Sequence, residues 1–154
     1  MTQDEKYMKS ALKEAQKAAL KDEVPVGAVI VKDGKIISRG HNLRENKKDP
    51  SAHAEFICML KAAKKLKGWR LLGCTLYVTI EPCPMCAGLI INSRIPRVVF
   101  GAHDKKAGAL GSIYNLNEGK LNHVCEITSG VLESECSQII KMYFKEKRNA
   151  KAVK

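Results

Sequence analysis

The feature that most constrains the fold of this 154-residue chain is a group of candidate metal ligands in two separate segments. His53 opens a His-x-Glu motif with Glu55, and Cys83 and Cys86 form a Pro-Cys-x-x-Cys motif later in the chain. Zinc prefers histidine nitrogen and cysteine sulfur, and three protein ligands leave a fourth position for water, as a catalytic zinc site requires. We therefore predict one Zn²⁺ per chain, bound by His53, Cys83 and Cys86, and a fold that brings the two segments together.

A Cys-x-x-Cys motif alone is also typical of redox pairs and structural zinc sites, so the other cysteines and the cell compartment matter. The N-terminal residues lack the basic start and apolar core of a secretory signal, and no apolar run approaches membrane-spanning length. We expect a soluble cytoplasmic protein, not a membrane protein, whose cysteines stay reduced. The other four cysteines lack paired spacing and lie in apolar segments, where we expect core residues: Cys58, Cys74, Cys125 and Cys136.

Helical and strand patterns alternate along the chain. Thr2 and Glu5 form a candidate capping box before the first helical pattern, and Asp33-Gly34 is a typical hairpin turn. Helices are predicted over residues 3–21, 49–67, 84–92 and 133–148, the second ending before Gly68. Strands are predicted over residues 26–31, 35–39, 74–79, 97–102 and 126–131. The lysine-rich tail after Arg148 is expected to fray.

This order of elements predicts one α/β domain over residues 1–154, with a largely parallel sheet that helices cover on both faces. The first hairpin supplies the antiparallel part. The candidate ligands fall at the starts of two successive helices, with His53 and Glu55 in the first turn of one and Cys83 and Cys86 at the start of the next. The positive ends of both helices would favour thiolate anions, so this placement also favours metal binding.

Glu55 lies two residues from His53, close enough to a bound metal to act on its water without being a ligand. An acid in the first turn of a helix can also simply complement the helix dipole. Together with the metal ligands, however, the pattern is similar to the signature of zinc deaminases, in which this glutamate is the general acid–base group. That resemblance implies attack by zinc-bound hydroxide on a ring carbon bearing an exocyclic amine, with Glu55 as the proton shuttle.

Longer segments resemble one branch of these enzymes, the bacterial tRNA-specific adenosine deaminases of the cytidine deaminase superfamily. The resemblance is carried by residues 24–29, 53–55, 75–88 and 97–102, by residues 108–112 after Asp104, and by Asn122-His123. It implies a three-layer αβα fold with a mixed five-stranded sheet, and a homodimer whose subunits both contribute to the RNA site. The implied activity is hydrolytic deamination of the wobble adenosine to inosine in a tRNA anticodon loop.

The resemblance also implies, position by position, a set of substrate contacts. Asn42 would read a purine edge through its amide, and Asp104 would accept a ribose hydroxyl. Phe144 and Arg148 would reach the anticodon loop with a stackable ring and a guanidinium group. The alternative for this pair is a core aromatic and a solvated basic face. The full set of implied contacts is Val26, Asn42, Ala54, Asp104, Asn122, Phe144 and Arg148.

The chain carries a formal net charge of +11, and the excess of cations is unevenly distributed. One cluster contains Lys61, Lys64, Lys65, Lys67 and Arg70, and a second contains Lys141, Lys145, Lys147, Arg148, Lys151 and Lys154, opposed only by Glu146. Such clusters attract polyanions, which favours a tRNA anticodon stem-loop as the partner. Two alternatives stay open: a deaminase of a free base or nucleoside, and a non-catalytic zinc module that binds RNA.

Overall fold

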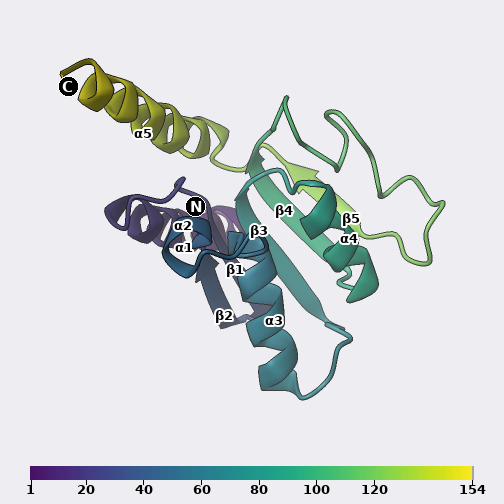
Figure 1. Cartoon of the computed structure of the whole chain (residues 1–154). Helices are drawn as coiled ribbons and strands as arrows, with labels where there is room; N and C mark the ends of the chain where they lie inside the picture. The colour runs from purple at the N-terminus through teal and green to yellow at the C-terminus, as the bar shows by residue number, and fades with distance from the viewer. Residues whose placement is uncertain (154) are drawn as a thin grey trace.

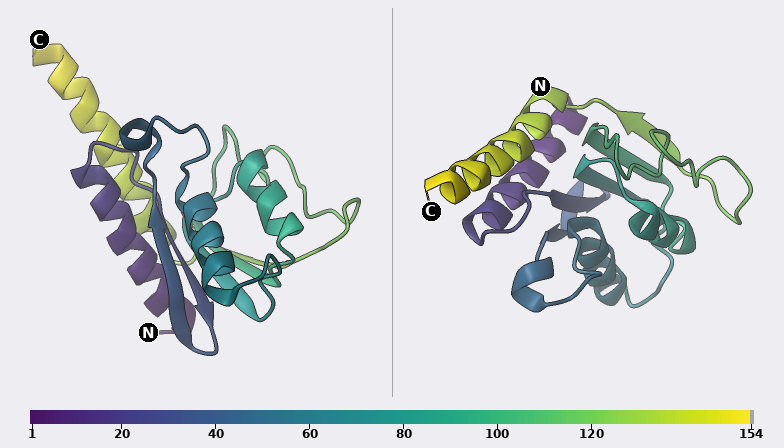
Figure 2. Two further views of the ribbon diagram at one scale, coloured as in Figure 1. Left: turned by 60° about the horizontal axis from the view of Figure 1, so that its bottom comes forward. Right: turned by 45° about the horizontal axis from the view of Figure 1, so that its top comes forward.

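A computed structural model, which describes residues 1–153, has three layers (Figure 1). Two helices cover one face of a central sheet, and two longer helices lie side by side on the other face (Figure 2). The first pair is α3 (Ala54–Leu66) and α4 (Pro84–Asn92), and the second pair is α1 (Gln3–Leu20) and α5 (Glu133–Val153). None of the helices in the described residues is both long and apolar enough to cross a membrane.

The sheet is mixed and contains five strands in the order β2-β1-β3-β4-β5. The strands are β1 (Gly27–Lys32), β2 (Lys35–His41), β3 (Cys74–Ile80), β4 (Arg97–Ala102) and β5 (Glu126–Ser129). Strand β1 pairs antiparallel with both β2 and β3, whereas β3, β4 and β5 are parallel. The predicted α/β fold with a mixed five-stranded sheet is confirmed. Its antiparallel part is larger than predicted, because β1 joins β3 as well as β2.

Local signals in the first 40 residues are confirmed. The Glu5 amide donates to Thr2 Oγ1 at 3.1 Å, and the Thr2 amide donates to Glu5 Oε1 at 3.0 Å, so the capping box starts α1. Asp33 and Gly34 both have positive φ, at 51° and 73°. Positive φ at both central residues is typical of the two-residue hairpin turn whose twist matches that of the flanking strands. The capping box therefore fixes the start of α1, and the two-residue turn fixes the β1–β2 hairpin.

The helix predicted over residues 49–67 begins later than expected, at Ala54. Asp49 accepts from the amide and hydroxyl of Ser51 at 2.8 and 2.7 Å, so the segment that was expected to start a helix forms a tight turn instead. His53 is consequently the N-cap of α3 and does not belong to its first turn. At the other end, Lys67 is the left-handed cap with φ 56°, one residue before the predicted Gly68.

Two further differences concern a short helix after β2 and the end of the last helix. A short helix, α2 (Arg44–Lys47), was not predicted. Helix α5 continues to Val153, past the predicted end at Arg148, because residues 149–153 contain several good helix formers and no glycine or proline. The prediction that the segment directly after Arg148 frays is therefore wrong up to Val153, and residue 154 lies outside the described chain. The far half of α5 projects beyond the sheet (Figure 1).

Alternate residues of the central strands pack on opposite faces of the sheet. Ile30 and Leu76 belong to the core under α3 and α4, whereas Val29 and Tyr77 belong to the core under α1 and α5. All six cysteines are free thiols, and the four expected in the core are buried there: Cys58, Cys74, Cys125 and Cys136. This two-sided core holds the starts of α3 and α4 in fixed positions at one end of the sheet.

Candidate active site

The N-termini of α3 and α4 both contribute to one site beside the end of β3. His53 is the N-cap of α3, Cys83 is the N-cap of α4, and Pro84 occupies the first turn of α4. Cys86 follows in the first turn and is fully buried. The free amides of two helix N-termini make the local potential positive, which favours negatively charged thiolates.

The three predicted metal ligands lie close enough to share one ion. His53 Nδ1 is 3.6 Å from Cys83 Sγ and 3.7 Å from Cys86 Sγ. A tetrahedral zinc ion with Zn–N of about 2.1 Å and Zn–S of about 2.3 Å separates nitrogen from sulfur by about 3.6 Å. All three ligand atoms lie within 4.8 Å of one another. Both the donor types and their spacing therefore fit a single zinc ion.

The two thiols of the motif have very different acidities. A hydrogen bond with Cys86, helped by one with His53, lowers the pKa of Cys83 to about 4 despite partial burial. The same hydrogen bond, together with burial, raises the pKa of Cys86. The hydrogen bond with Cys83 also raises the pKa of His53. Cys83 is therefore the more acidic thiol of the motif.

Glu55 lies in the first turn of α3 and is almost fully buried, with 3% of its surface exposed. It lines the same cavity as His53 and Cys83 but is not part of the ligand group. Burial raises its pKa to about 7. A carboxyl group whose pKa lies near neutrality can both accept and donate a proton, which is the requirement for general acid–base chemistry.

A cavity of about 140 Å³ adjoins the ligand group. A cavity of about 150 Å³ is known to hold benzene, so this volume is on the scale of a flat aromatic group. Three of the implied substrate contacts line it, and they lie directly before β1, directly after β2 and at the start of α3: Val26, Asn42 and Ala54. Residues far apart in the sequence thus meet around one ring-sized space.

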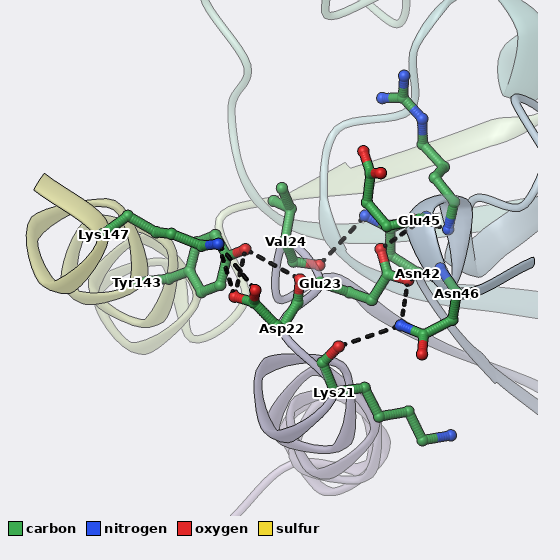
Figure 3. Close-up of a pocket in the computed structure, with 10 residues that line it drawn as sticks. Lys21, Asp22, Glu23, Val24, Asn42, Glu45, Asn46, Tyr143 and Lys147 are labelled. Atoms are coloured by element: carbon green, nitrogen blue, oxygen red, sulfur yellow. Dashed lines mark hydrogen bonds and ion pairs between the residues drawn. The ribbon is translucent and has the colours of Figure 1, made fainter. Parts of the chain in front are cut away.

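The Asn42 amide is held in one orientation by the backbone around it. Its Nδ2 donates to the Val24 carbonyl at 3.3 Å, and its Oδ1 accepts from the Arg44 amide at 3.2 Å (Figure 3). Only 7% of the residue is exposed. Because an amide has two donor hydrogens and two acceptor lone pairs, one of each is still free for a ligand.

Asp104 lies outside the small cavity, in a wider adjoining pocket of about 890 Å³. Its Oδ1 accepts from the Lys106 and Ala107 amides at 2.9 and 3.1 Å, which folds the loop after β4. Glu81, directly before Pro82, organises this loop. Its buried carboxylate accepts from the backbone amides of Asp104, Leu110 and Ser112 and from the Ser112 hydroxyl.

The close fit of this loop against Glu81 also requires a glycine. A Cβ on Gly108 would lie 2.4 Å from Glu81 Cδ, so no larger residue fits there. Burial raises the pKa of Glu81, but the hydrogen bonds from Ser112, Asp104 and Leu110 outweigh it and lower that pKa overall. Glu81 is therefore an ionised buried anchor for the loop that carries Asp104.

Phe144 and Arg148 lie on the exposed face of α5 near this wider pocket. Phe144 is 44% exposed and lines the pocket together with Asp104. It also borders, with Arg148 and Lys145, a groove of about 640 Å³. The interpretation of Phe144 as a core aromatic is therefore wrong. Tyr143 and Lys147, by contrast, turn toward Asp22 on the α1 side (Figure 3).

Asn122 is the implied contact that lines neither the small cavity nor the wider pockets beside it. It is exposed in the loop before β5, and its neighbour His123 contacts the Ile95 carbonyl at 2.7 Å. Ile95 lies just before β4 begins, whereas the cavity lies where β3 ends, and these parallel strands place the two points at opposite ends of the sheet. Within one chain, Asn122 is remote from the site.

Sequence patterns missed several residues of the site. Arg44 and Ile80 line the cavity but belong to no motif that assigns them a role. Glu81 lies inside the Glu-Pro-Cys segment, and its place beside a predicted metal ligand is evident from the sequence. Its contacts with Leu110 and Ser112 are not, because they depend on how the distant loop folds.

Comparisons with known proteins show that this chain is similar to deaminases. A family model described as MafB19-like deaminase matches residues 2–148. The tRNA-specific adenosine deaminase of Bacillus subtilis strain 168 is 55% identical over 152 residues, which cover 98% of this chain and 94% of the relative. A solved structure from work on A-to-I editing by tRNA:A34 deaminases at the wobble position of transfer RNA has a TM-score of 0.83 and 42% identity, over 87% of this chain and 98% of that chain.

A guanine deaminase of known structure, also from Bacillus subtilis, is similar over a smaller part of the chain. It has a TM-score of 0.62 and 42% identity, over 64% of each chain. A similar fold therefore occurs in a deaminase whose name assigns it a different base.

Proposed function

This chain belongs to the tRNA-specific adenosine deaminase family, and we propose on that premise that it is a cytoplasmic enzyme that converts the wobble adenosine of a tRNA anticodon loop to inosine. The observation that carries the proposal is the convergence of His53, Cys83 and Cys86 beside a ring-sized cavity that also contains the Glu55 carboxyl. This arrangement supports hydrolytic chemistry on one base.

The reaction replaces an exocyclic amine by a carbonyl oxygen taken from water. A zinc ion held by His53, Cys83 and Cys86 would supply the Lewis acidity that makes water a nucleophile near neutral pH. Glu55 takes a proton from the attacking water and delivers it to the adjacent ring nitrogen. It then carries a second proton from the new hydroxyl to the amine, which leaves as ammonia with the electrons of the broken C–N bond. Glu55 returns to its starting state.

Substrate selection follows from two different parts of the site. The fixed amide of Asn42 would bind the edge of the base, while Val26 and Ala54 would border its ring. Asp104 and the exposed side of α5, with Phe144 and Arg148, would meet the ribose and the adjoining nucleotides. An aromatic ring beside cations suits unpaired RNA, because bases stack on the ring and phosphates meet the charges.

We expect an anticodon stem-loop with adenosine at the wobble position to be deaminated far more efficiently than free guanine, cytidine or adenosine. Replacing Lys145 and Arg148 together by alanine should raise KM and flatten the dependence of log KM on log salt by up to about one unit per lost phosphate contact. Replacing Lys9 and Lys13 together by alanine, on the exposed side of the neighbouring helix α1, removes the same charge and is the control. Steady-state kinetics at several salt concentrations measure the effect, and faster turnover of a free base without salt dependence contradicts the proposal.

We also propose that the protein is a homodimer formed through the outer face of α3 and α4 and the loop before β5. This face exposes several large apolar side chains, namely Leu60, Met85, Leu121 and Val124. Gly88 lies within α4, and a Cβ there would meet nothing within 4 Å. Glycine weakens a helix by about 1 kcal/mol, so an open glycine is explained if a second backbone approaches it closely. A second copy is also the way Asn122 could reach a substrate.

Sedimentation should therefore give about twice the chain mass of 17.0 kDa. Gly88→Arg should give a monomer with reduced activity on the stem-loop, although the chain itself should become more stable because arginine favours the helix. Sedimentation and thermal unfolding of the same sample separate these effects. A wild-type monomer with full activity would remove the dimer from the proposal.

A further inference from the structure

A second basic surface lies at the end of the molecule opposite the candidate active site. Helix α3 starts at the metal ligands and is 13 residues long, so its C-terminal end is about 20 Å from them. Around that end lie an exposed tryptophan, Trp69, and a group of cations. We call this group the distal basic surface: Lys61, Lys64, Lys65, Lys67, Trp69, Arg70 and Arg94.

The cations of the distal basic surface are not neutralised within the described chain. None of them has a carboxylate within 4.0 Å among residues 1–153, whereas Arg97 pairs with Asp4 and Lys147 pairs with Asp22. Lysines in the last turn of α3 complement the helix dipole, which accounts for Lys64 and Lys65. Arg70 lies beyond the helix and is not explained in this way.

Trp69 is the second, independent observation. It is 54% exposed, and the guanidinium groups of Arg70 and Arg94 lie 4.2 and 5.8 Å from its ring centroid. Arg94 is itself fixed, because it donates to the Ile91 carbonyl at 2.8 Å at the end of α4. An exposed indole with two guanidinium groups near its ring, among lysines that have no carboxylate partner within residues 1–153, combines the stacking face and the positive charge that unpaired nucleic acid binds.

We propose that the distal basic surface binds the substrate tRNA outside the anticodon loop, with Trp69 stacked on an RNA base and the cations on phosphates. This proposal rests on the proposed function. Distance separates the two contacts: a surface that begins about 12 Å along α3 from the metal ligands and continues past about 20 Å does not touch the reacting nucleotide, so it adds affinity without changing the chemistry. A full tRNA would engage both surfaces, whereas a short loop oligonucleotide would engage only the active site.

The sequence provides a direct reporter, because Trp69 is the single tryptophan of the chain. Titration with full-length tRNA should quench its fluorescence, whereas a loop oligonucleotide without a stem should leave it unchanged. Replacing Lys64, Lys67 and Arg70 by alanine should raise KM for tRNA, leave kcat unchanged, and flatten the salt slope by about three units if each contacts one phosphate. KM for the loop oligonucleotide should not change.

The matched control removes three exposed lysines from α1, on the other face of the sheet: Lys6, Lys9 and Lys13. This variant has the same net charge as the test variant and should keep the wild-type KM. Unchanged fluorescence at saturating tRNA, or equal KM values for both triple variants, overturns the inference. Loss of the dimer in the test variant also overturns it, because the surface would then bind protein. If the wild type deaminates no tRNA at all, the proposed function fails instead.

Discussion

Replacing Glu55 by glutamine should lower kcat on the anticodon stem-loop by about 10²–10⁴-fold, the usual contribution of a general acid–base group. Glutamine has nearly the same size and keeps a polar group in the cavity, but it cannot accept and release a proton. Glu55 is outside the metal-ligand group, so the variant should keep its zinc. KM should change little, since the carboxylate would act on the water and on proton transfer more than on binding.

Glu14→Gln is the control for this experiment. Glu14 is also 3% exposed, but it lies on α1, where it contacts His41 at 3.0 Å, away from the cavity. Its replacement should affect thermal stability and leave kcat within a few-fold of wild type. Single-turnover kinetics, zinc analysis and thermal unfolding of both variants complete the test. Near-wild-type turnover by Glu55→Gln would exclude it as the proton shuttle.

The metal-ligand group could be predicted from the sequence because its chemistry depends on residue types and local spacing. Cys83 and Cys86 lie one helical turn apart on a helix that Pro84 starts, so the motif itself fixes their proximity. The approach of His53 required only that α3 and α4 start at the same end of the sheet. The alternation of strands and helices implies this arrangement.

The surroundings of the site could not be predicted in the same way, since they depend on contacts between distant segments. Glu81 holds its loop through amides of Leu110 and Ser112, about 30 positions away, and no periodicity records such contacts. Helical spacing cannot tell whether Phe144 faces the core or solvent when the far half of the helix projects beyond the sheet (Figure 1). The Asn122-His123 motif does not indicate whether Asn122 would contact a substrate in its own subunit or in a partner subunit.

Competing local signals explain why the predicted start of α3 was wrong. Asp49, Pro50 and Ser51 are all residues that favour helix starts, yet they equally favour a turn closed by the Asp49 carboxylate, and the turn is what forms. The choice between them is made by packing. His53 must stand outside the helix as its N-cap for its ring to meet Cys83 and Cys86.

Removing a metal ligand should have an effect as large as removing the proton shuttle, but with a different signature. We expect about one zinc per wild-type chain, and we expect Cys83→Ala and Cys86→Ala each to lose both the metal and the activity, because two remaining ligands bind zinc weakly. Metal that binds only the folded state stabilises it, so both variants and the chelator-treated wild type should unfold at lower temperature.

The two cysteine variants should nevertheless differ once zinc is absent. Cys86 is fully buried whereas Cys83 is half-buried, so Cys86→Ala leaves a small cavity and should unfold at a lower temperature than metal-free Cys83→Ala. Cys136→Ala, which removes a buried thiol of α5 itself, is the control and should retain zinc. Elemental analysis and thermal unfolding measure both quantities independently of activity. If both ligand variants keep one zinc per chain, the metal must bind elsewhere, and the convergence of His53 with the two cysteines would need another explanation.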